Sequence, residues 1–575
     1  MRSSRSIVAI ALASGLVAAA TVAHSLGLYL PAFNTPHTAL EGVPHPKTAL
    51  LPTPGLTRRL AVVIVDGLDF EAARAVPAFA PLRRAGVLRP LRAAFPTYTS
   101  PALIAMVTGL SPRESGIRIN GSLDHGPRGT DRVTTEAGLA GVAVELWSRE
   151  WKPFAELLEP PAGASIRAGR VGFLASVVAA RAPLAERLPP LDGRSPSRAL
   201  TFVYIGEIDE IAHWRGTRSP EYRDAVALAG NLVDRYAATL DFDQDTLIVL
   251  SDHGHRPEGG HGGMEAEAQS AFLLARGPLL RQGVEIDERP LRDVASTLSV
   301  LAGVPVPTSN LGRPMLDLLA LGDRERSLLL AAPFDQTSRL QCGLAGASEA
   351  ERCAAIDPLV TRLRQADPTA WPEAEALHDA LTDVRDRSVA TAGDEAARRR
   401  LAITAATIAL VAAALGLAAR RRKIGAAGLA DPASWALPVI HLGAYAGVLA
   451  AFDYRITFST MKPTPSFMFD ATFASIAGIT AVALAARGLR AGPRAPWILL
   501  AALTIPGALL AALVGWEPTR LPPPIAGILV FELAPAIISG ACAAVVIAAL
   551  RPRAEPVALA DAAAASPPEP FRRTG

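Results

Sequence analysis

The sequence predicts an α/β domain built on a mostly parallel sheet between helices, followed by a membrane-embedded part. Between residues 60 and 275, short runs rich in β-branched residues alternate with helical patterns, which is typical of a parallel sheet covered by helices. Only 19% of the 575 residues are charged and 50% are hydrophobic, whereas soluble domains contain about 25% charged residues. The balance of 57 basic and 54 acidic residues disfavours a protein that binds a nucleic-acid polymer.

Residues 1–31 are expected to form an N-terminal transmembrane anchor. The segment 6–30 is uncharged, follows Arg2 and Arg5, and exceeds the about 20 apolar residues that cross a bilayer. A cleaved signal peptide is the alternative. Its apolar region would be only about 7–15 residues long, and residues 21–23 form a poor cleavage site, so the anchor is favoured.

Residues 32–325 are expected to form the α/β domain. Its clearest strands lie at residues 60–65, 142–146, 200–205, 246–250 and 271–275. Residues 326–400 are interpreted as a helical connector, because the stretch after Asp367 is rich in Ala, Glu and Arg and leads into an apolar block.

Five apolar blocks follow, at about residues 401–419, 435–452, 467–486, 497–514 and 525–550. Their lengths predict a bundle of five transmembrane helices over residues 401–550. Basic residues follow the first, third and fifth blocks, and the positive-inside rule assigns these segments to the cytoplasm. Residues 32–400 are therefore expected on the extracytoplasmic side, and residues 551–575 form a disordered cytoplasmic tail.

Three of the predicted strands are followed by aspartates, and histidines lie close to them in the chain. Open α/β sheets bind ligands at the carboxyl ends of their strands. Carboxylates with imidazoles suit zinc, and manganese is the less favoured metal. The residues are Asp66, Asp209 and Asp252 with His213, His253 and His261. The alternative is that the aspartates cap helices and that His255 is solvated, but three such aspartates together favour a metal site.

Thr99 precedes Pro101, at the expected start of a helix. One interpretation is a helix N-cap, which is favoured when this segment is taken alone. The other is a nucleophile, because a helix N-terminus attracts phosphate. Coordination to a metal would then replace a general base in activating the hydroxyl group.

These motifs in this order resemble the alkaline phosphatase superfamily, most closely its type I phosphodiesterase/nucleotide pyrophosphatase branch. The resemblance covers about residues 58–315 and depends on residues 65–67, 96–99, 108–117, 209–213, 251–254 and 261–263. It implies an alkaline phosphatase-like fold that holds two zinc ions, with manganese as the alternative. One metal would be held by Asp209, His213 and His261, and the other by Asp66, Asp252, His253 and the nucleophile Thr99.

Two further positions are compared with the same family. Asn120 matches the asparagine that hydrogen-bonds the phosphoryl oxygens, although a turn residue before Gly121 is an equally favoured interpretation. His255 stands where many members have methionine.

The membrane architecture resembles that of the GPI ethanolamine phosphate transferases. This resemblance implies a membrane-bound phosphodiesterase or phosphotransferase, with phosphoethanolamine transfer from a lipid donor as the favoured activity. Hydrolysis of exported nucleotide or lipid phosphodiesters is the alternative. A non-catalytic lipid-handling membrane protein is the alternative from another class, and the intact set of metal ligands disfavours it.

Two acidic residues are predicted to bind a lipid head group, and two cysteines are predicted to form a disulfide. Asp470 and Glu532 lie near the outer ends of the third and fifth blocks, and acidic residues within membrane spans are costly. They are predicted to bind a cationic lipid head group, whereas the alternative places both at the membrane interface. Cys342 and Cys353 are expected to form a disulfide in an oxidising compartment.

Overall fold

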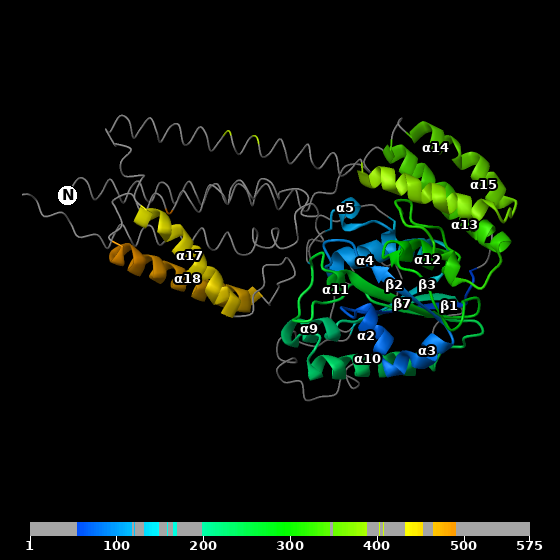
Figure 1. Ribbon diagram of the computed structural model, residues 1–575. Coiled ribbons are helices and arrows are strands. Elements are labelled where there is room, and N and C mark those ends of the chain that lie inside the picture. The colour runs from blue at the N-terminus through cyan, green and yellow to red at the C-terminus, as the bar shows by residue number, and fades with distance from the viewer. Residues whose placement is uncertain are drawn as a thin grey trace, which may run out of the picture.

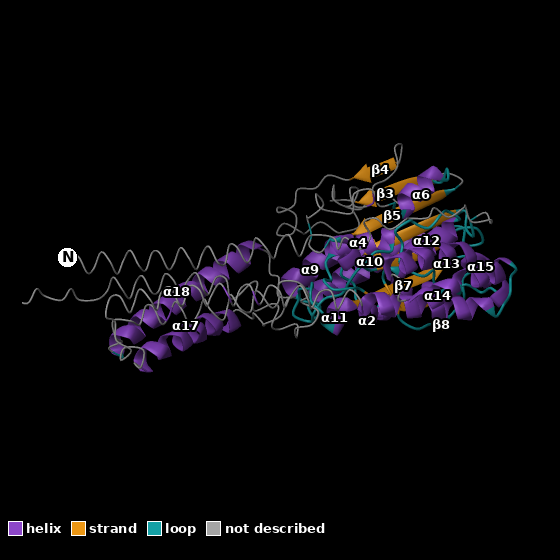
Figure 2. Cartoon of the chain, turned by 90° about the horizontal axis from the view of Figure 1, so that it is seen from above, coloured by secondary structure: helices purple, strands orange, loops and turns teal. Residues whose placement is uncertain are grey.

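In the computed structural model, a mixed sheet with helices on both faces forms the centre of the α/β domain (Figures 1 and 2). The structure describes residues 55–117, 120, 131–148, 158, 165–168, 198–345, 349–387, 402, 406, 432–451, 464–489 and 499. The strands are β1 (Arg59–Val65), β2 (Val87–Arg92), β3 (Ala143–Ser148), β4 (Ser165–Ala168), β5 (Ala199–Ile205), β6 (Thr246–Leu250), β7 (Ser270–Arg276), β8 (Val284–Glu285) and β9 (Arg289–Pro290).

The strand order is β4-β3-β5-β1-β6-β7-β2-β8, with β9 paired to β2. Strands β4, β3, β5, β1 and β6 run parallel to one another. Strand β7 is antiparallel to both β6 and β2. The five predicted strands are all present, and the prediction of a mostly parallel sheet is confirmed.

Helices cover the two faces of this sheet. One face carries α4 (Thr99–Thr108), α6 (Val133–Leu139), α12 (Asp293–Ala302), α13 (Asp323–Ala345) and α15 (Ile356–Arg364), and the other carries α2 (Phe70–Ala75), η2 (Pro77–Phe79), α3 (Ala80–Arg84), α9 (Glu207–Arg215) and α10 (Pro220–Ala237). The remaining short helices are α5 (Pro112–Ser115), α11 (Ala266–Gln269), η5 (Leu316–Leu318) and α14 (Ala350–Ala354).

Strand β1 shows why its sequence is continuously apolar. Leu60, Val62 and Ile64 pack into the core on the α4 side. Ala61, Val63 and Val65 alternate with them and pack into the core on the α10 side. A central parallel strand is buried on both faces, so every position of β1 must be apolar.

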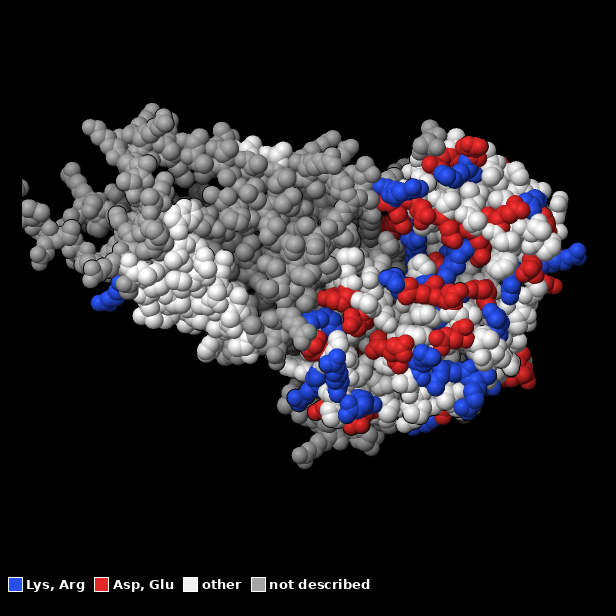
Figure 3. Space-filling view, viewed as in Figure 1, with Lys and Arg blue, Asp and Glu red and all other residues white. Residues whose placement is uncertain are grey.

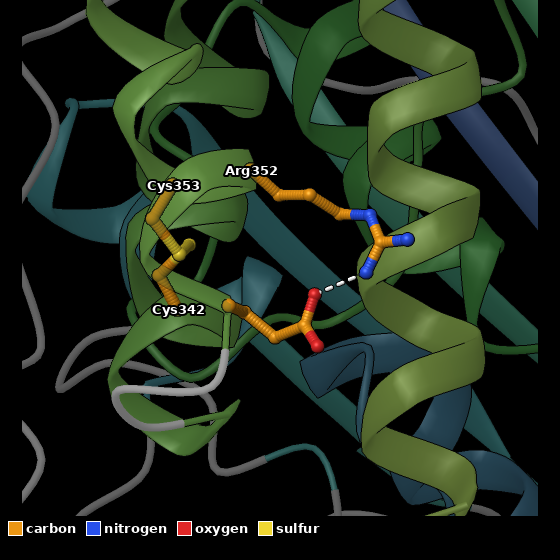
Figure 4. The surroundings of a disulfide bond; sticks show 4 residues. Cys342, Arg352 and Cys353 are labelled. Carbon is orange, nitrogen blue, oxygen red and sulfur yellow. Dashed lines mark hydrogen bonds and ion pairs between the residues drawn. A yellow bond between two sulfur atoms is a disulfide. The ribbon is translucent and has the colours of Figure 1, made fainter.

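The segment expected as a connector packs against the α/β domain. Leu330 and Phe334 of α13 and Val360 of α15 belong to the same hydrophobic core as the sheet. The expected disulfide is present, since Cys342 near the end of α13 is bonded to Cys353 in α14. Figure 4 shows this bond beside Arg352, whose guanidinium group pairs with Glu349.

Helices α17 (Pro432–Ala451) and α18 (Thr464–Gly488) coincide with the second and third apolar blocks. No helix in the described part of the chain is both long and apolar enough to cross a membrane. The predicted anchor, most of the first and fourth blocks, all of the fifth and the predicted tail lie outside the described residues. The five-helix membrane bundle therefore stays a prediction.

The surface of α17 and α18 differs from that of the α/β domain. Blue and red side chains are interspersed over the domain in Figure 3, whereas the visible face of the two helices is almost uniformly white. Large apolar side chains are exposed there, among them Val439 at 71%, Ile476 at 56% and Leu484 at 68%. Exposed apolar surface of this kind marks contact with lipid or with another protein segment.

Candidate metal centre

The carboxyl ends of three neighbouring strands bring the predicted acidic residues together. Asp66 follows β1 directly, Asp252 lies two residues after β6, and Asp209 lies in the first turn of α9 after β5. Strand β1 pairs with both β5 and β6, so the three strand ends are adjacent. The clustering expected from the strand ends is present, and two groups form: Asp209 lies beside His213, His255 and His261, and Asp66 and Asp252 lie beside His253. The donor atoms of Asp209, His253, His255 and His261, and those of Asp66, Asp252 and His253, are close enough together to hold a metal ion.

The first group gathers around one oxygen atom of Asp209. Its Oδ1 lies 3.5 Å from His213 Nε2, 3.3 Å from His261 Nε2 and 2.9 Å from His255 Nε2. The Nε2 atoms of His213 and His261 are 2.9 Å apart. Three imidazole nitrogens and a carboxylate oxygen therefore converge on a volume the size of one cation.

The second group gathers around Nε2 of His253. This atom lies 3.3 Å from Asp66 Oδ1, 3.4 Å from Asp252 Oδ2 and 3.4 Å from Thr99 Oγ1. The two carboxylate oxygens are buried and accept no hydrogen bond from the described residues. A buried carboxylate oxygen requires a hydrogen bond or a cation, so this donor set fits a metal such as zinc.

Thr99 is the first helical residue of α4, and Tyr98 occupies the N-cap position. The capping interpretation of Thr99 is therefore wrong, because its hydroxyl group faces His253 in the second group. The backbone N–H of the next residue, Ser100, donates a 2.9 Å hydrogen bond to Asn120 Oδ1. Asn120 lies in a turn, and its amide is held at the N-terminus of the helix that carries Thr99.

Burial and like charges control the ionisation of the carboxylates. Burial raises the pKa of Asp66 well above its ordinary value, and the charges of Asp252 and Asp209 raise it further. Burial also raises the pKa of Asp252 to about 6. Burial would raise the pKa of Asp209. The charge of His213 and hydrogen bonds from His255 and His261 outweigh burial and hold this pKa well below its ordinary value. Like charges crowded in this way are relieved by a bound cation.

The histidine of the second group is held in its neutral form. Burial lowers the pKa of His253 well below its ordinary value. A neutral imidazole is the form that binds metals. Its Nδ1 atom lies 3.2 Å from the carbonyl oxygen of Gly254, which leaves Nε2 directed toward Asp66 and Asp252.

Sequence reasoning missed three side chains around the two groups. His255 was given no role in the predicted site, and the alternative interpretation of a solvated His255 is wrong, because only 1% of its surface is exposed and it contacts Asp209. The Tyr204 hydroxyl donates to Asp66 Oδ2 from the neighbouring strand β5. Thr97 joins the loop before Thr99 to the loop around His261. Of these, only His255 had a sequence signal, since it lies two residues from His253.

No described contact joins Asp470 or Glu532, the two acidic residues of the predicted membrane spans, to the candidate metal centre. Asp470 lies in α18, but its side chain is outside the described part, and Glu532 lies wholly outside the described residues. Their role in binding a head group stays a prediction.

Comparison with known proteins agrees with the motifs. Residues 60–170 and 178–268 match the family described as type I phosphodiesterase / nucleotide pyrophosphatase. GPI ethanolamine phosphate transferase 3 of Saccharomyces cerevisiae is 28% identical over 191 residues, which cover 30% of this chain and 18% of the relative. The catalytic subunit of GPI ethanolamine phosphate transferase 3 from Mus musculus is 30% identical over 138 residues, which cover 23% of this chain and 12% of the relative. The chain thus matches less than a fifth of the length of these two relatives.

The solved structure of murine ectonucleotide pyrophosphatase / phosphodiesterase 5 in complex with AMP is 18% identical, with a TM-score of 0.37. The match covers 47% of this chain and 100% of that structure.

Proposed function

We propose that this chain, which carries an enzyme domain of the type I phosphodiesterase/nucleotide pyrophosphatase family in the alkaline phosphatase superfamily, transfers a phosphoryl group by way of Thr99. The observation that supports this proposal is the position of the Thr99 hydroxyl group. It lies at the N-terminus of the ten-residue helix α4 and 3.4 Å from His253, beside the carboxylates of Asp66 and Asp252. A helix N-terminus favours the negative charge of a phosphate at this place.

Two divalent cations, zinc by the donor set and manganese as the alternative, would neutralise phosphoryl oxygens and lower the pKa of the nucleophile when bound. Asp209, His213 and His261 would hold one, and Asp66, Asp252 and His253 the other, with Thr99 as a further oxygen donor.

The reaction then proceeds by two successive displacements at phosphorus, in which Thr99 is first the nucleophile and then the leaving group. Thr99 Oγ1 loses its proton and forms a bond to phosphorus, while the bond from phosphorus to the departing oxygen breaks and that oxygen takes up a proton to leave as the alcohol. In the second displacement the hydroxyl group of an acceptor, or water, attacks the same phosphorus and releases Thr99. The hydrogen bond from Ser100 to Asn120 Oδ1 orients the Asn120 amide so that its N–H groups can donate to a phosphoryl oxygen.

Phosphoethanolamine transfer from a lipid donor is the favoured activity. It is supported by the similarity to the GPI ethanolamine phosphate transferases and by the apolar helices α17 and α18 that follow the domain. Hydrolysis of exported nucleotide or lipid phosphodiesters is the alternative, which the description of the matched family favours. In both versions the protein is held in a membrane with the α/β domain on the extracytoplasmic side.

The test compares the full chain with its Thr99→Ala and Thr99→Ser variants in vesicles that contain phosphatidylethanolamine. Appearance of diacylglycerol measures cleavage, and free phosphoethanolamine measures hydrolysis rather than transfer to an added acceptor. Thr99→Ala should lower cleavage at least about 1,000-fold because the nucleophile is removed, whereas Thr99→Ser should retain part of the rate.

A small aryl phosphodiester serves as the second substrate, because it needs no lipid site. If the protein cleaved the aryl diester but not the lipid, the proposed phosphodiesterase activity would stand and the proposal of a lipid donor would be rejected. A Thr99→Ala variant that cleaved either substrate at the wild-type rate would reject the covalent mechanism.

A further inference from the structure

His255 is a buried imidazole to which the mechanism above gives no role. Its side chain has 1% exposure, and its Nε2 atom lies 2.9 Å from Asp209 Oδ1, the oxygen around which the first group gathers. The His255 ring centre is 5.0 Å from that of His213 and 4.9 Å from that of His261, both edge to face. The ring therefore borders the same volume as the two histidines assigned to this metal.

The spacing of donor atoms is that of a metal's coordination shell. When zinc binds four donors at about 2.0–2.1 Å in a tetrahedron, the donors lie about 3.3 Å from one another. Asp209 Oδ1 is 3.5 Å from His213 Nε2, 3.3 Å from His261 Nε2 and 2.9 Å from His255 Nε2. His255 is thus at least as close to the shared oxygen as either assigned ligand.

The backbone beside Asp66 is shaped to admit this ring. Gly67 has a φ of +71°, and a Cβ atom there would lie 2.7 Å from His255 Nε2. Gly254 is similarly enclosed, since a Cβ atom would lie 2.3 Å from the carbonyl oxygen of Glu267. The residue before His255 is therefore fixed in place, and the residue after Asp66 has no side chain that would displace the imidazole.

We propose that His255 is a fourth protein ligand of the metal at Asp209, His213 and His261. This inference rests on the metal-binding part of the proposed function and adds a residue to it. Four protein donors are typical of a zinc ion that is held tightly, and zinc can expand to five ligands, so a phosphoryl oxygen could still bind. The site of Asp66, Asp252 and His253 has three protein donors besides Thr99. The first site should therefore bind zinc more tightly than the second.

The experiment measures zinc directly in the purified full chain. X-ray absorption spectroscopy at one zinc per chain counts the imidazoles bound to the metal, and competition with a chelator gives the affinity. The wild type should bind two zinc ions and show three imidazoles on the first. His255→Met should show two imidazoles and should weaken the first zinc at least about 100-fold, more than the loss of an outer partner.

His255→Gln separates a ligand from a residue that only positions Asp209, because its amide keeps a donor for Asp209 but is a poor zinc ligand. If His255 binds the metal, His255→Gln should resemble His255→Met. Wild-type affinity in His255→Gln, or three imidazoles in His255→Met, would overturn the proposal. His378→Met is the matched control, since His378 is a buried histidine outside both groups, at 5% exposure, and its zinc binding should equal that of the wild type.

The same measurements keep this proposal apart from the proposed function. A wild-type chain that bound no zinc and no manganese would reject the metal-dependent mechanism as a whole. Two bound zinc ions with only two imidazoles on the first would reject the role of His255 alone.

Discussion

At the residue scale, one threonine connects the loop of Thr99, the proposed nucleophile, to the loop of His261, a proposed metal ligand. The Thr97 hydroxyl accepts a 2.8 Å hydrogen bond from the N–H of Gly262 and donates a 3.1 Å bond to the carbonyl of Gly263. Its own carbonyl oxygen lies 2.6 Å from His261 Nδ1. Partners of this kind orient a metal-binding imidazole and select its tautomer.

Thr97→Val should therefore impair the site without removing a ligand. The valine keeps the shape of the side chain but leaves the buried N–H of Gly262 without its acceptor. We expect zinc affinity and the rate with an aryl phosphodiester to fall about 10-fold to 100-fold. Thr308→Val is the control, because that threonine donates a single hydrogen bond to Asp131 and lies outside both metal groups. Equal effects of the two substitutions would contradict the assigned role.

At the element scale, the ends of β1 and β6 opposite the metal groups are joined by an ion-pair cluster. Arg58 Nε lies 3.0 Å from Asp245 Oδ1, and Arg59 Nε lies 2.9 Å from Asp245 Oδ2. The Asp245 side chain has no exposed surface. Burial acts to raise its pKa, but hydrogen bonds from Arg59 and Arg58 outweigh it and lower the pKa to about 2.

Asp245→Asn should therefore destabilise the domain at neutral pH, by up to about 2 kcal/mol if the shift is taken in full. Because the folded-state pKa lies below the ordinary value of 3.8, this stabilisation is present above about pH 4 and is lost as the pH falls through about 2. The difference in thermal unfolding temperature between wild type and variant should thus be largest at pH 7 and shrink toward pH 2. Asp243→Asn, at an exposed neighbour, is the control. A difference that did not change with pH would refute the ion-pair explanation.

The strands that sequence reasoning missed have a common physical cause. Strand β2 contains Arg89, Pro90 and Arg92, and a proline within an apolar run argues against a strand. Strand β4 has four residues, and β8 and β9 have two each. Such short or polar segments become strands because a neighbour offers hydrogen bonds, as β7 does for β2, and not because of their own composition.

At the scale of the whole molecule, the disulfide and the apolar helices agree with an extracytoplasmic domain held at a membrane. Disulfides persist in oxidising compartments, and Cys342 is bonded to Cys353, with both residues packed against the hydrophobic core of the α/β domain. The exposed apolar side chains of α17 and α18 contrast with the charged surface of that domain (Figure 3).

This arrangement predicts how cysteines react in intact cells. Leu139→Cys, at a site with 73% exposure in α6, should react with a maleimide that cannot cross membranes. Lys423→Cys should react only after the cells are permeabilised, because the basic segment at 420–423 is expected in the cytoplasm. The wild-type chain gives the background from Cys542. The opposite pattern of labelling would reverse the topology.

The sequence by itself determined the strand ends that carry Asp66, Asp209 and Asp252, and with them the place of the candidate metal centre. It did so because buried strands have a regular apolar pattern, and ligands collect where parallel strands end. Only the tertiary structure decided the partners of these residues. Tyr204 reaches Asp66 across 138 positions of the chain, and His255 reaches Asp209 across 46. Contacts of this range depend on strand register and on the space left by Gly67, and neither is encoded in a local pattern.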